Sequence, residues 1–370
     1  MNNKRLLSLD VLRGLDLFML VGLQPILWQA LPKIEYTFFN TTLLQQIDHV
    51  QWEGFSAWDL VMPLFLFMSG VTIPFSLPKY LEQHNNIQLW KRVLKRVIVL
   101  FILGMVVQGN ILSLNPERIY IYSNTLQAIA TGYLLTVPMA LYLKPRTQVI
   151  AIVALLLIYT IPMTLFGDWS PQGNFACEID KMVLGRFRDG SYIDSAGVWQ
   201  FAPWYDYTWV WSSLTFCCTV AMGSLAGSII RNGNDNRHRT ALILFLTGIA
   251  LIAAGSVWGI WQPIIKRIWS GSMTLYSGGW CYLLLAAFYW WIDVKGHKRG
   301  TEWLQYYGCN AISAYIIGEV VNFRSVAESL LHGTEQYIGE WYPVLLTTAN
   351  SAILFAILAI MYKQKIFLKV

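Results

Sequence analysis

Charged residues are scarce in this chain of 370 residues: 13% are Asp, Glu, Lys or Arg, whereas 55% are hydrophobic. An ordinary soluble domain carries about 25% charged residues, so the composition excludes a soluble globular fold. No small-residue cleavage site follows the first apolar run, which begins near Leu12, so we expect no cleavable signal peptide. Cysteines are also few and lack the spacing of a metal site, so we expect them in the core and expect no metal. The five are Cys177, Cys217, Cys218, Cys281 and Cys309.

Long apolar runs recur along the whole chain. At about 18 to 24 residues, each is long enough to cross a hydrocarbon core about 30 Å thick. The sequence therefore predicts an all-α fold, a polytopic integral membrane bundle of about ten transmembrane helices, with one transmembrane domain over residues 1–370. The predicted spans are 10–31, 57–77, 93–112, 123–143, 148–166, 207–230, 240–261, 272–292, 304–322 and 342–362.

The net charge of +6 does not indicate nucleic-acid binding, because the basic residues fall in short loops rather than on one soluble face. If alternate loops lie in the cytoplasm, that side holds 18 of the 27 Lys and Arg residues. The positive-inside rule then predicts that both termini are cytoplasmic. The 18 residues are Lys4, Arg5, Lys79, Lys91, Arg92, Lys95, Arg96, Lys144, Arg146, Arg231, Arg237, Arg239, Lys295, Lys298, Arg299, Lys363, Lys365 and Lys369.

Three segments on the opposite side, 32–56, 167–205 and 322–341, are longer than a bare connection needs. The middle one leads into a Trp- and Tyr-rich stretch, FAPWYDYTW. Such rings can lie at the lipid headgroups or stack on the apolar face of a sugar, and the sequence leaves both interpretations open.

The first predicted span contains three charged residues, although a charge inside a membrane normally requires a partner or a cavity. Asp10, Arg13 and Asp16 are spaced by three, so they share one side of a helix. One interpretation is a mutually neutralising pair at the cytoplasmic mouth. The other is that Arg13 binds a phosphate of an anionic cofactor.

His49 differs from the other four histidines because it lies among acidic and aromatic residues at the mouth of a predicted helix. An imidazole in that position can accept a proton at neutral pH, although a structural role is the alternative. Asp59 also has a structural interpretation, because Ser56-Ala57-Trp58-Asp59 fits a capping box.

Other polar residues interrupt the predicted spans or lie near them. An amide in such a place can form a hydrogen bond between helices. Lys266 and Arg267 fall on the predicted outer side, where they either reach the headgroups or line a cavity with His49. The amide and acidic residues of this kind are Gln108, Asn110, Gln127, Asn310, Glu319 and Asn322.

Motifs spread over nearly the whole chain resemble successive signatures of one family. They are RLLSLDVLRGLDLF, WEGFSAWDLVMPLFLFMSG, NTLQAIATGYLL at 124–135, EIDKMVLG, GSLAG at 223–227, PIIKRIWSGS, YYGCNAISAYIIGEV and MYKQKIFLKV. In this order they are similar to the heparan-α-glucosaminide N-acetyltransferase family of transmembrane acyltransferases. The luminal domain that precedes the first helix in lysosomal members is missing, so the chain resembles a short bacterial form.

The resemblance implies transfer of acetyl from cytoplasmic acetyl-CoA, through the bundle, to the amino group of a glucosamine-type sugar on the far side of a bacterial inner membrane. It matches the family's catalytic histidine to His49, and either Asp48 or Asp59 would orient the ring. The chain departs from the family pattern at Gln24, Glu53 and Ala128, where Asn, Asn and Arg are common. Candidate residues for binding acetyl-CoA are Arg13, Asp16, Gln24, Gln127, Lys266, Ser270 and Asn310.

Several alternatives remain open from the sequence. The intramembrane polar residues also suit a solute transporter, although paired broken helices in two matching halves are not evident. O-acylation of a surface polysaccharide is a second alternative, and a covalent acetyl-histidine route competes with direct transfer. The small residues Gly223, Ala226 and Gly227 allow close helix packing, either within the chain or in a homodimer.

Overall fold

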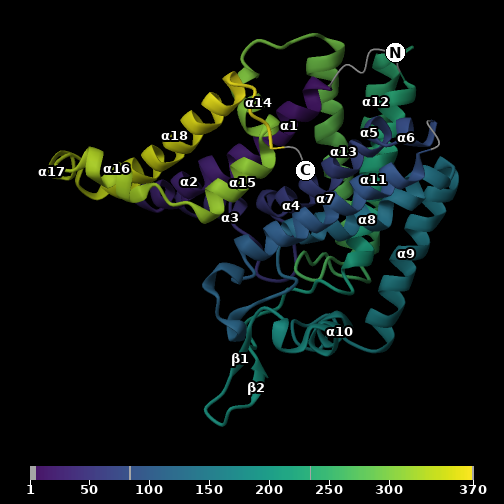
Figure 1. The fold of residues 1–370 in the computed structure, drawn as a ribbon, viewed down its shortest axis with the longest axis horizontal. Coiled ribbons are helices and arrows are strands. Elements are labelled where there is room, and N and C mark those ends of the chain that lie inside the picture. Colours follow the sequence, from purple (N-terminus) through teal and green to yellow (C-terminus); the bar gives the residue numbers. More distant parts are fainter. Residues whose placement is uncertain (1–5, 83–84, 234, 369–370) are drawn as a thin grey trace. The chain divides into compact units, whose positions relative to one another are not determined.

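The computed structural model describes residues 6–82, 85–233 and 235–368. The described chain is mostly helical, with one short strand pair, which confirms the all-α membrane bundle (Figure 1). Three residues named above, Lys4, Arg5 and Lys369, lie outside the described residues, and so do the side chain of Lys79 and one of the other four histidines, His84.

Within the described ranges, six helical segments are long and apolar enough to span a membrane. They are Leu7–Lys33, Ala57–Ser76, Pro145–Leu165, Ser213–Asn232, Arg237–Trp258 and Glu335–Lys363. The other four predicted spans also coincide with helices, but the total of ten spans remains a prediction.

Two compact units make up the chain. Of the described residues, unit 1 contains 6–50, 56–61 and 287–368, and unit 2 contains 51–55, 62–82, 85–233 and 235–286. The elements of unit 1 are α1 (Leu7–Leu17), the π-helix η1 (Phe18–Leu23), α2 (Gln24–Ala30), η2 (Leu31–Lys33), η3 (Phe38–Leu43), α3 (Leu44–Gln46), η4 (Ala57–Leu60), η8 (Tyr289–Val294), α14 (Glu302–Cys309), α15 (Ala311–Val320), α16 (Arg324–Leu331), α17 (Glu335–Ile338), η9 (Gly339–Trp341) and α18 (Tyr342–Lys363).

Unit 2 continues from the second residue of α4 (Val61–Val71) to near the end of α13 (Gly271–Phe288). Between these helices lie α5 (Ile73–Ser76), α6 (Pro78–Glu82), α7 (Asn86–Val107), η5 (Ile111–Ser113), η6 (Pro116–Arg118), α8 (Thr125–Tyr142), α9 (Pro145–Leu165), α10 (Phe175–Leu184), η7 (Gly185–Phe187), β1 (Ser191–Ile193), β2 (Trp199–Phe201), α11 (Ser213–Asn232) and α12 (Arg237–Trp258). The strands β1 and β2 form an antiparallel hairpin in which Tyr192 pairs with Gln200.

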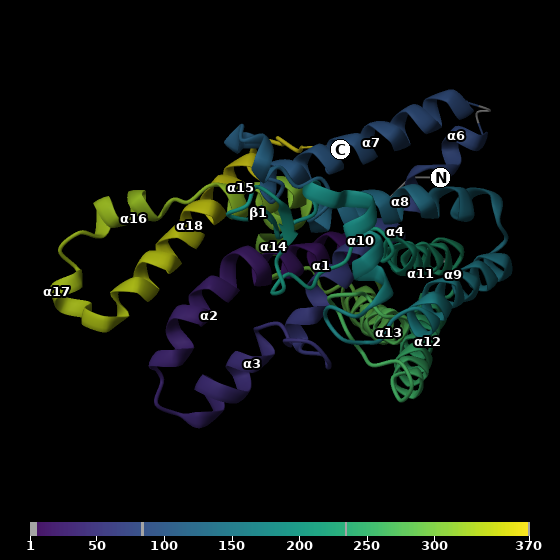
Figure 2. The same cartoon turned by 90° about the horizontal axis from the view of Figure 1, so that it is seen from below.

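In unit 1, α1 and α14 approach each other backbone to backbone. A Cβ atom added at Gly14 would lie 1.9 Å from the carbonyl oxygen of Leu304, and one added at Gly308 would lie 1.8 Å from that of Asp10. Only glycine fits either position. An apolar cluster of Leu31, Ile47 and Trp58, with Leu27 of α2 packed against it, joins the end of the first helical segment to the segment that carries His49. Figure 2 shows α2 and α3 side by side.

In unit 2, α11 packs closely against α4. Cβ atoms added at Gly223 and Gly227 would lie 2.0 and 2.3 Å from the carbonyl oxygens of Phe67 and Val71. The small residues of the GSLAG segment are thus used for packing within the chain. Core placement is confirmed for four of the five cysteines, whereas Cys309 is half-buried.

The long outer segments have structure of their own. The predicted connection 167–205 contains α10 and the β-hairpin, and the connection 322–341 contains α16 and α17. In the first, the guanidinium of Arg188 is buried, with its Nη2 donating to the carbonyl of Tyr205 at 3.0 Å. These segments are therefore folded parts of the protein.

Candidate active site

His49 lies in the short loop between α3 and η4, and its ring meets a buried carboxylate. The distance from His49 Nδ1 to Asp59 Oδ1 is 2.8 Å. The Asp59 side chain is 1% exposed and that of His49 is 35% exposed. The histidine ring is thus partly exposed to solvent, and the carboxylate that it contacts is buried.

The capping box predicted for this segment is confirmed. The Ser56 hydroxyl accepts the Asp59 N–H at 3.3 Å, and Asp59 Oδ2 accepts the Ser56 N–H at 3.0 Å. Since Oδ1 of the same carboxylate faces His49, Asp59 both begins the helix and contacts the imidazole. The structural and functional interpretations of Asp59 are therefore compatible.

Asp48 is placed differently. Its carboxylate accepts the backbone N–H of His49 at 2.7 Å on the exposed side of the loop, and its carbonyl oxygen accepts the Ser56 hydroxyl at 2.7 Å. Of the two acidic residues predicted to orient the ring, Asp59 is the one that contacts a ring nitrogen.

Gln24 also supports this loop. Its Nε2 donates to the carbonyl oxygen of Ile47 at 2.9 Å, and both residues are buried. The amide therefore fixes the backbone two residues before His49. This contact explains why a polar side chain is retained at that point of an otherwise apolar helix.

The three charged residues of α1 lie in unit 1 with His49. Arg13 Nη1 is 4.0 Å from Asp10 Oδ1, a distance at the outer limit of an ion pair. The Arg13 side chain is 22% exposed, whereas Asp10 and Asp16 are buried. Among the described residues, Asp16 Oδ2 has no hydrogen-bond partner.

Asn310 interrupts the helical segment formed by α14 and α15. Its backbone angles, φ −115° and ψ 36°, are not helical. The side chain is fully buried, and neither its oxygen nor its nitrogen has a hydrogen-bond partner among the described residues. Buried amides are normally paired, so Asn310 stands out among the predicted binding residues.

The remaining three predicted binding residues belong to unit 2, where two of them have clear structural roles. Gln127 Oε1 accepts the backbone N–H groups of Ser123 and Asn124 at 2.9 and 3.1 Å, which fixes the start of α8. The Ser270 hydroxyl donates to the carbonyl of Pro263 at 2.9 Å and accepts the Ile265 N–H at 3.1 Å.

Lys266, the third, is buried on the turn that Ser270 closes. This turn pairs with the segment that follows His49 in the sequence, because Gly54 donates its N–H to the carbonyl of Ile264 at 2.9 Å. Trp269 on the same turn has a positive φ of 53°, an uncommon conformation that is often found at functional sites. The sequence contained no signal for it.

Asp180, within the EIDKMVLG segment, was not identified from the sequence as an important residue. Its carboxylate accepts the backbone N–H groups of Trp209 and Val210 at 2.8 and 2.9 Å, which joins α10 to the approach to α11. Burial raises the pKa of Asp180 to about 7, although both hydrogen bonds and the charge of Arg188 act in the opposite direction.

The described ranges contain no group of three or more His, Cys, Asp or Glu side chains that could hold a metal ion. The arrangement at His49 suits proton transfer. A neutral imidazole can accept a proton, and the carboxylate on Nδ1 stabilises the resulting cation.

Comparisons with known proteins agree with the motifs. Residues 5–172 match the family described as "Heparan-alpha-glucosaminide N-acetyltransferase, catalytic". The chain is 22% identical to heparan-alpha-glucosaminide N-acetyltransferase of Homo sapiens over 417 aligned positions and 22% identical to that of Mus musculus over 418. Both alignments cover 99% of this chain, which spans only 60% of the length of each relative. The chain therefore resembles the heparan-α-glucosaminide N-acetyltransferase family along nearly its whole length.

Proposed function

We propose that this protein is an acetyl-CoA-dependent transmembrane N-acetyltransferase. It takes acetyl from cytoplasmic acetyl-CoA and transfers it to the amino group of a glucosamine-type sugar on the other side of a bacterial inner membrane. The observation that carries the proposal is the 2.8 Å contact between His49 Nδ1 and the buried Asp59 carboxylate. The family match over residues 5–172 includes both residues and supports the reaction class.

In this mechanism His49 is the general base. As the amine nitrogen attacks the thioester carbonyl, Nε2 of His49 takes its proton, and a tetrahedral intermediate forms. Collapse of that intermediate breaks the carbon–sulfur bond, and its electron pair leaves on sulfur. The imidazolium returns its proton to the thiolate, which gives CoA and neutral His49. Asp59 stabilises the imidazolium and holds Nδ1 protonated.

Two residues of unit 1 suit the donor substrate. Arg13 has a partly exposed guanidinium on the helix α1, where its charge can attract a phosphate of CoA. Asn310 has a buried amide without a partner among the described residues, so it can donate to the thioester oxygen or to the pantetheine arm. We prefer direct transfer to an acetyl-histidine route because both substrates could meet at the outer mouth.

The test replaces His49 with alanine in purified, folded protein and measures acetylation of glucosamine by acetyl-CoA. We expect turnover to fall by about 10²- to 10⁴-fold, the usual contribution of a general base. His332→Ala is the matched control, because this exposed histidine lies in another predicted outer segment. Turnover near the unmodified level in His49→Ala would reject the proposal.

A transporter is the competing class, and one observation favours it. Within unit 1, the non-helical backbone of Asn310 separates α14 from α15. Interrupted helices of this kind are common in transporters. For the proposed enzyme, acetyl-CoA alone raises the melting temperature, because a ligand of the folded state stabilises it. O-acylation is distinguished by its product, since hydroxylamine cleaves an ester but leaves an amide intact.

A further inference from the structure

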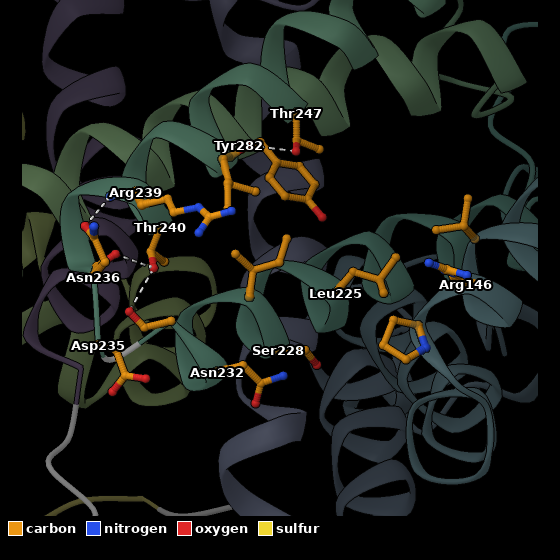
Figure 3. A pocket seen from close by; sticks show the side chains of 15 residues that line it. Arg146, Leu225, Ser228, Asn232, Asp235, Asn236, Arg239, Thr240, Thr247 and Tyr282 are labelled. Carbon is orange, nitrogen blue, oxygen red and sulfur yellow. Dashed lines mark hydrogen bonds between the residues drawn. The ribbon is translucent and has the colours of Figure 1, made fainter.

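A pocket of about 690 Å³ lies in unit 2, and the residues assigned above to catalysis are not part of its lining (Figure 3). Its walls come from the beginning of α9, the end of α11 and the first turns of α12. The volume is within the range of about 300–1,000 Å³ that is typical of small-molecule sites.

The chemistry of the pocket changes along α12. Arg239, Ile243 and Thr247 line it at every fourth position, so they follow one face of the helix for roughly 12 Å. Leu225 and Ile229 line it from α11. Figure 3 shows Asn232, Asn236 and Arg239 near one end and Thr247 farther along. The pocket is therefore polar at the interhelical loop and mainly apolar beyond it.

The pocket opens on a surface that suits lipid. In the apolar windows of the α9 and α12 spans, only 28% of the residues are buried. Val149 of α9 and Ile243 of α12 are 51% and 40% exposed. Both line the pocket. An acyl chain that lies between these helices would cover this exposed apolar surface.

Two arginines supply positive charge to the lining. Arg146 lies in the first turn of α9 and Arg239 in the first turn of α12, and Figure 3 shows them on either side of Leu225. Among the described residues, neither guanidinium forms an ion pair within 4.0 Å. The lining contains one carboxylate, Asp235, against these two arginines, so its balance of charge is positive. Basic pockets between transmembrane helices are suited to anionic lipid headgroups.

We propose that this pocket binds an anionic glycerophospholipid, with its phosphate between Arg146 and Arg239 and one acyl chain along Ile243 and Thr247. A nucleotide phosphate fits the arginines equally well but leaves the apolar part of the pocket uncovered. A lipid satisfies both parts. The site is independent of the proposed acetyl transfer.

The test uses full-length protein delipidated in a neutral detergent. Phosphatidylglycerol and phosphatidylcholine with the same acyl chains, inorganic phosphate and CoA are added separately, and thermal unfolding and the bound lipid mass are measured. We expect phosphatidylglycerol to bind and to raise the melting temperature more than the other three. The double variant Arg146→Gln/Arg239→Gln should weaken its binding about 25-fold, if each arginine contributes the factor of about five typical of a basic residue at an anionic surface.

Two further variants make the test specific. Lys298→Gln/Arg299→Gln removes the same charge from exposed residues that do not line the pocket, and it should bind phosphatidylglycerol normally. Ile243→Trp fills the apolar part without a charge change and should reduce binding. Equal binding of phosphatidylglycerol by the double arginine variant would overturn the proposal. So would equal stabilisation by inorganic phosphate, or stabilisation by CoA that the arginine variant abolishes.

Discussion

The Nδ1 atom of His49 lies 2.8 Å from Oδ1 of Asp59, and the other oxygen of that carboxylate accepts the backbone N–H of Ser56. Asp59→Asn keeps an oxygen for the helix start but cannot stabilise a histidine cation. We expect acetyl transfer to fall by about 10²- to 10⁴-fold, with little change in melting temperature.

Asp48 provides the comparison for that prediction. Because its carboxylate contacts only the backbone N–H of His49 on the exposed side, Asp48→Asn should retain most of the rate. Steady-state kinetics on both variants measure which substitution lowers the rate of acetyl transfer more. A larger loss for Asp48→Asn than for Asp59→Asn would contradict the assignment of Asp59 as the orienting acid.

Gln24→Met removes the donor that satisfies the buried carbonyl of Ile47. Leaving such a group unpaired costs about 1–3 kcal/mol, so the free energy of unfolding should fall by that amount. Turnover should also fall, with an unchanged pH–rate profile, because glutamine does not titrate. Gln46→Met is the control, since its side-chain oxygen accepts the Ala57 N–H at an exposed position. Equal destabilisation of both variants would argue against a special role for Gln24.

Arg13→Gln tests the path of the cofactor. A hydrogen bond to a charged group contributes about 1.5–3 kcal/mol, so the affinity for acetyl-CoA should weaken roughly 10- to 100-fold. Affinity for the sugar should not change. Isothermal titration with each ligand measures both values, and Arg299→Gln controls for the loss of one basic residue. Unchanged acetyl-CoA affinity in Arg13→Gln would reject the phosphate contact.

Asp180 should make stability depend on pH. Its folded pKa of about 7 lies above the ordinary value of 3.8, so the folded protein holds this proton more tightly than the unfolded chain does. Its contribution to stability is therefore present below about pH 4 and is lost as the pH rises to about 7, by an amount on the order of a few kcal/mol.

Thermal unfolding between pH 4 and 8 measures this effect. Asp180→Asn should flatten the decline in melting temperature toward neutral pH, whereas Glu340→Gln, at an exposed position, should leave it unchanged. A decline of the same size in Asp180→Asn would mean that another group is responsible.

Local patterns predicted much of this structure. Apolar runs identified the helical segments, and the Ser56–Asp59 spacing identified a capping box, because both depend on neighbours in the sequence. The composition around His49 also distinguished it from the other histidines. The sequence could not decide between Asp48 and Asp59, since that choice depends on how the loop folds back.

The sequence did not predict the contacts between residues that lie far apart in the chain. Gln24 and Gln127 looked alike as amides in apolar spans, yet one fixes the loop before His49 and the other fixes the start of α8. The pattern around Asn310 predicted a continuous span, whereas its backbone angles interrupt the helix. Such differences follow from tertiary packing, which one-dimensional patterns do not encode.

The contact of Gly14 with Leu304 and of Gly308 with Asp10 has a consequence for biosynthesis. Ribosomes synthesise a chain from its N-terminus to its C-terminus, so α1 leaves the ribosome long before α14. Nearly the whole protein is therefore translated before this backbone contact can form. During that interval the Asp10–Arg13 pair of α1 lacks its final surroundings. Insertion machinery or neighbouring early helices must shelter these charges until α14 arrives.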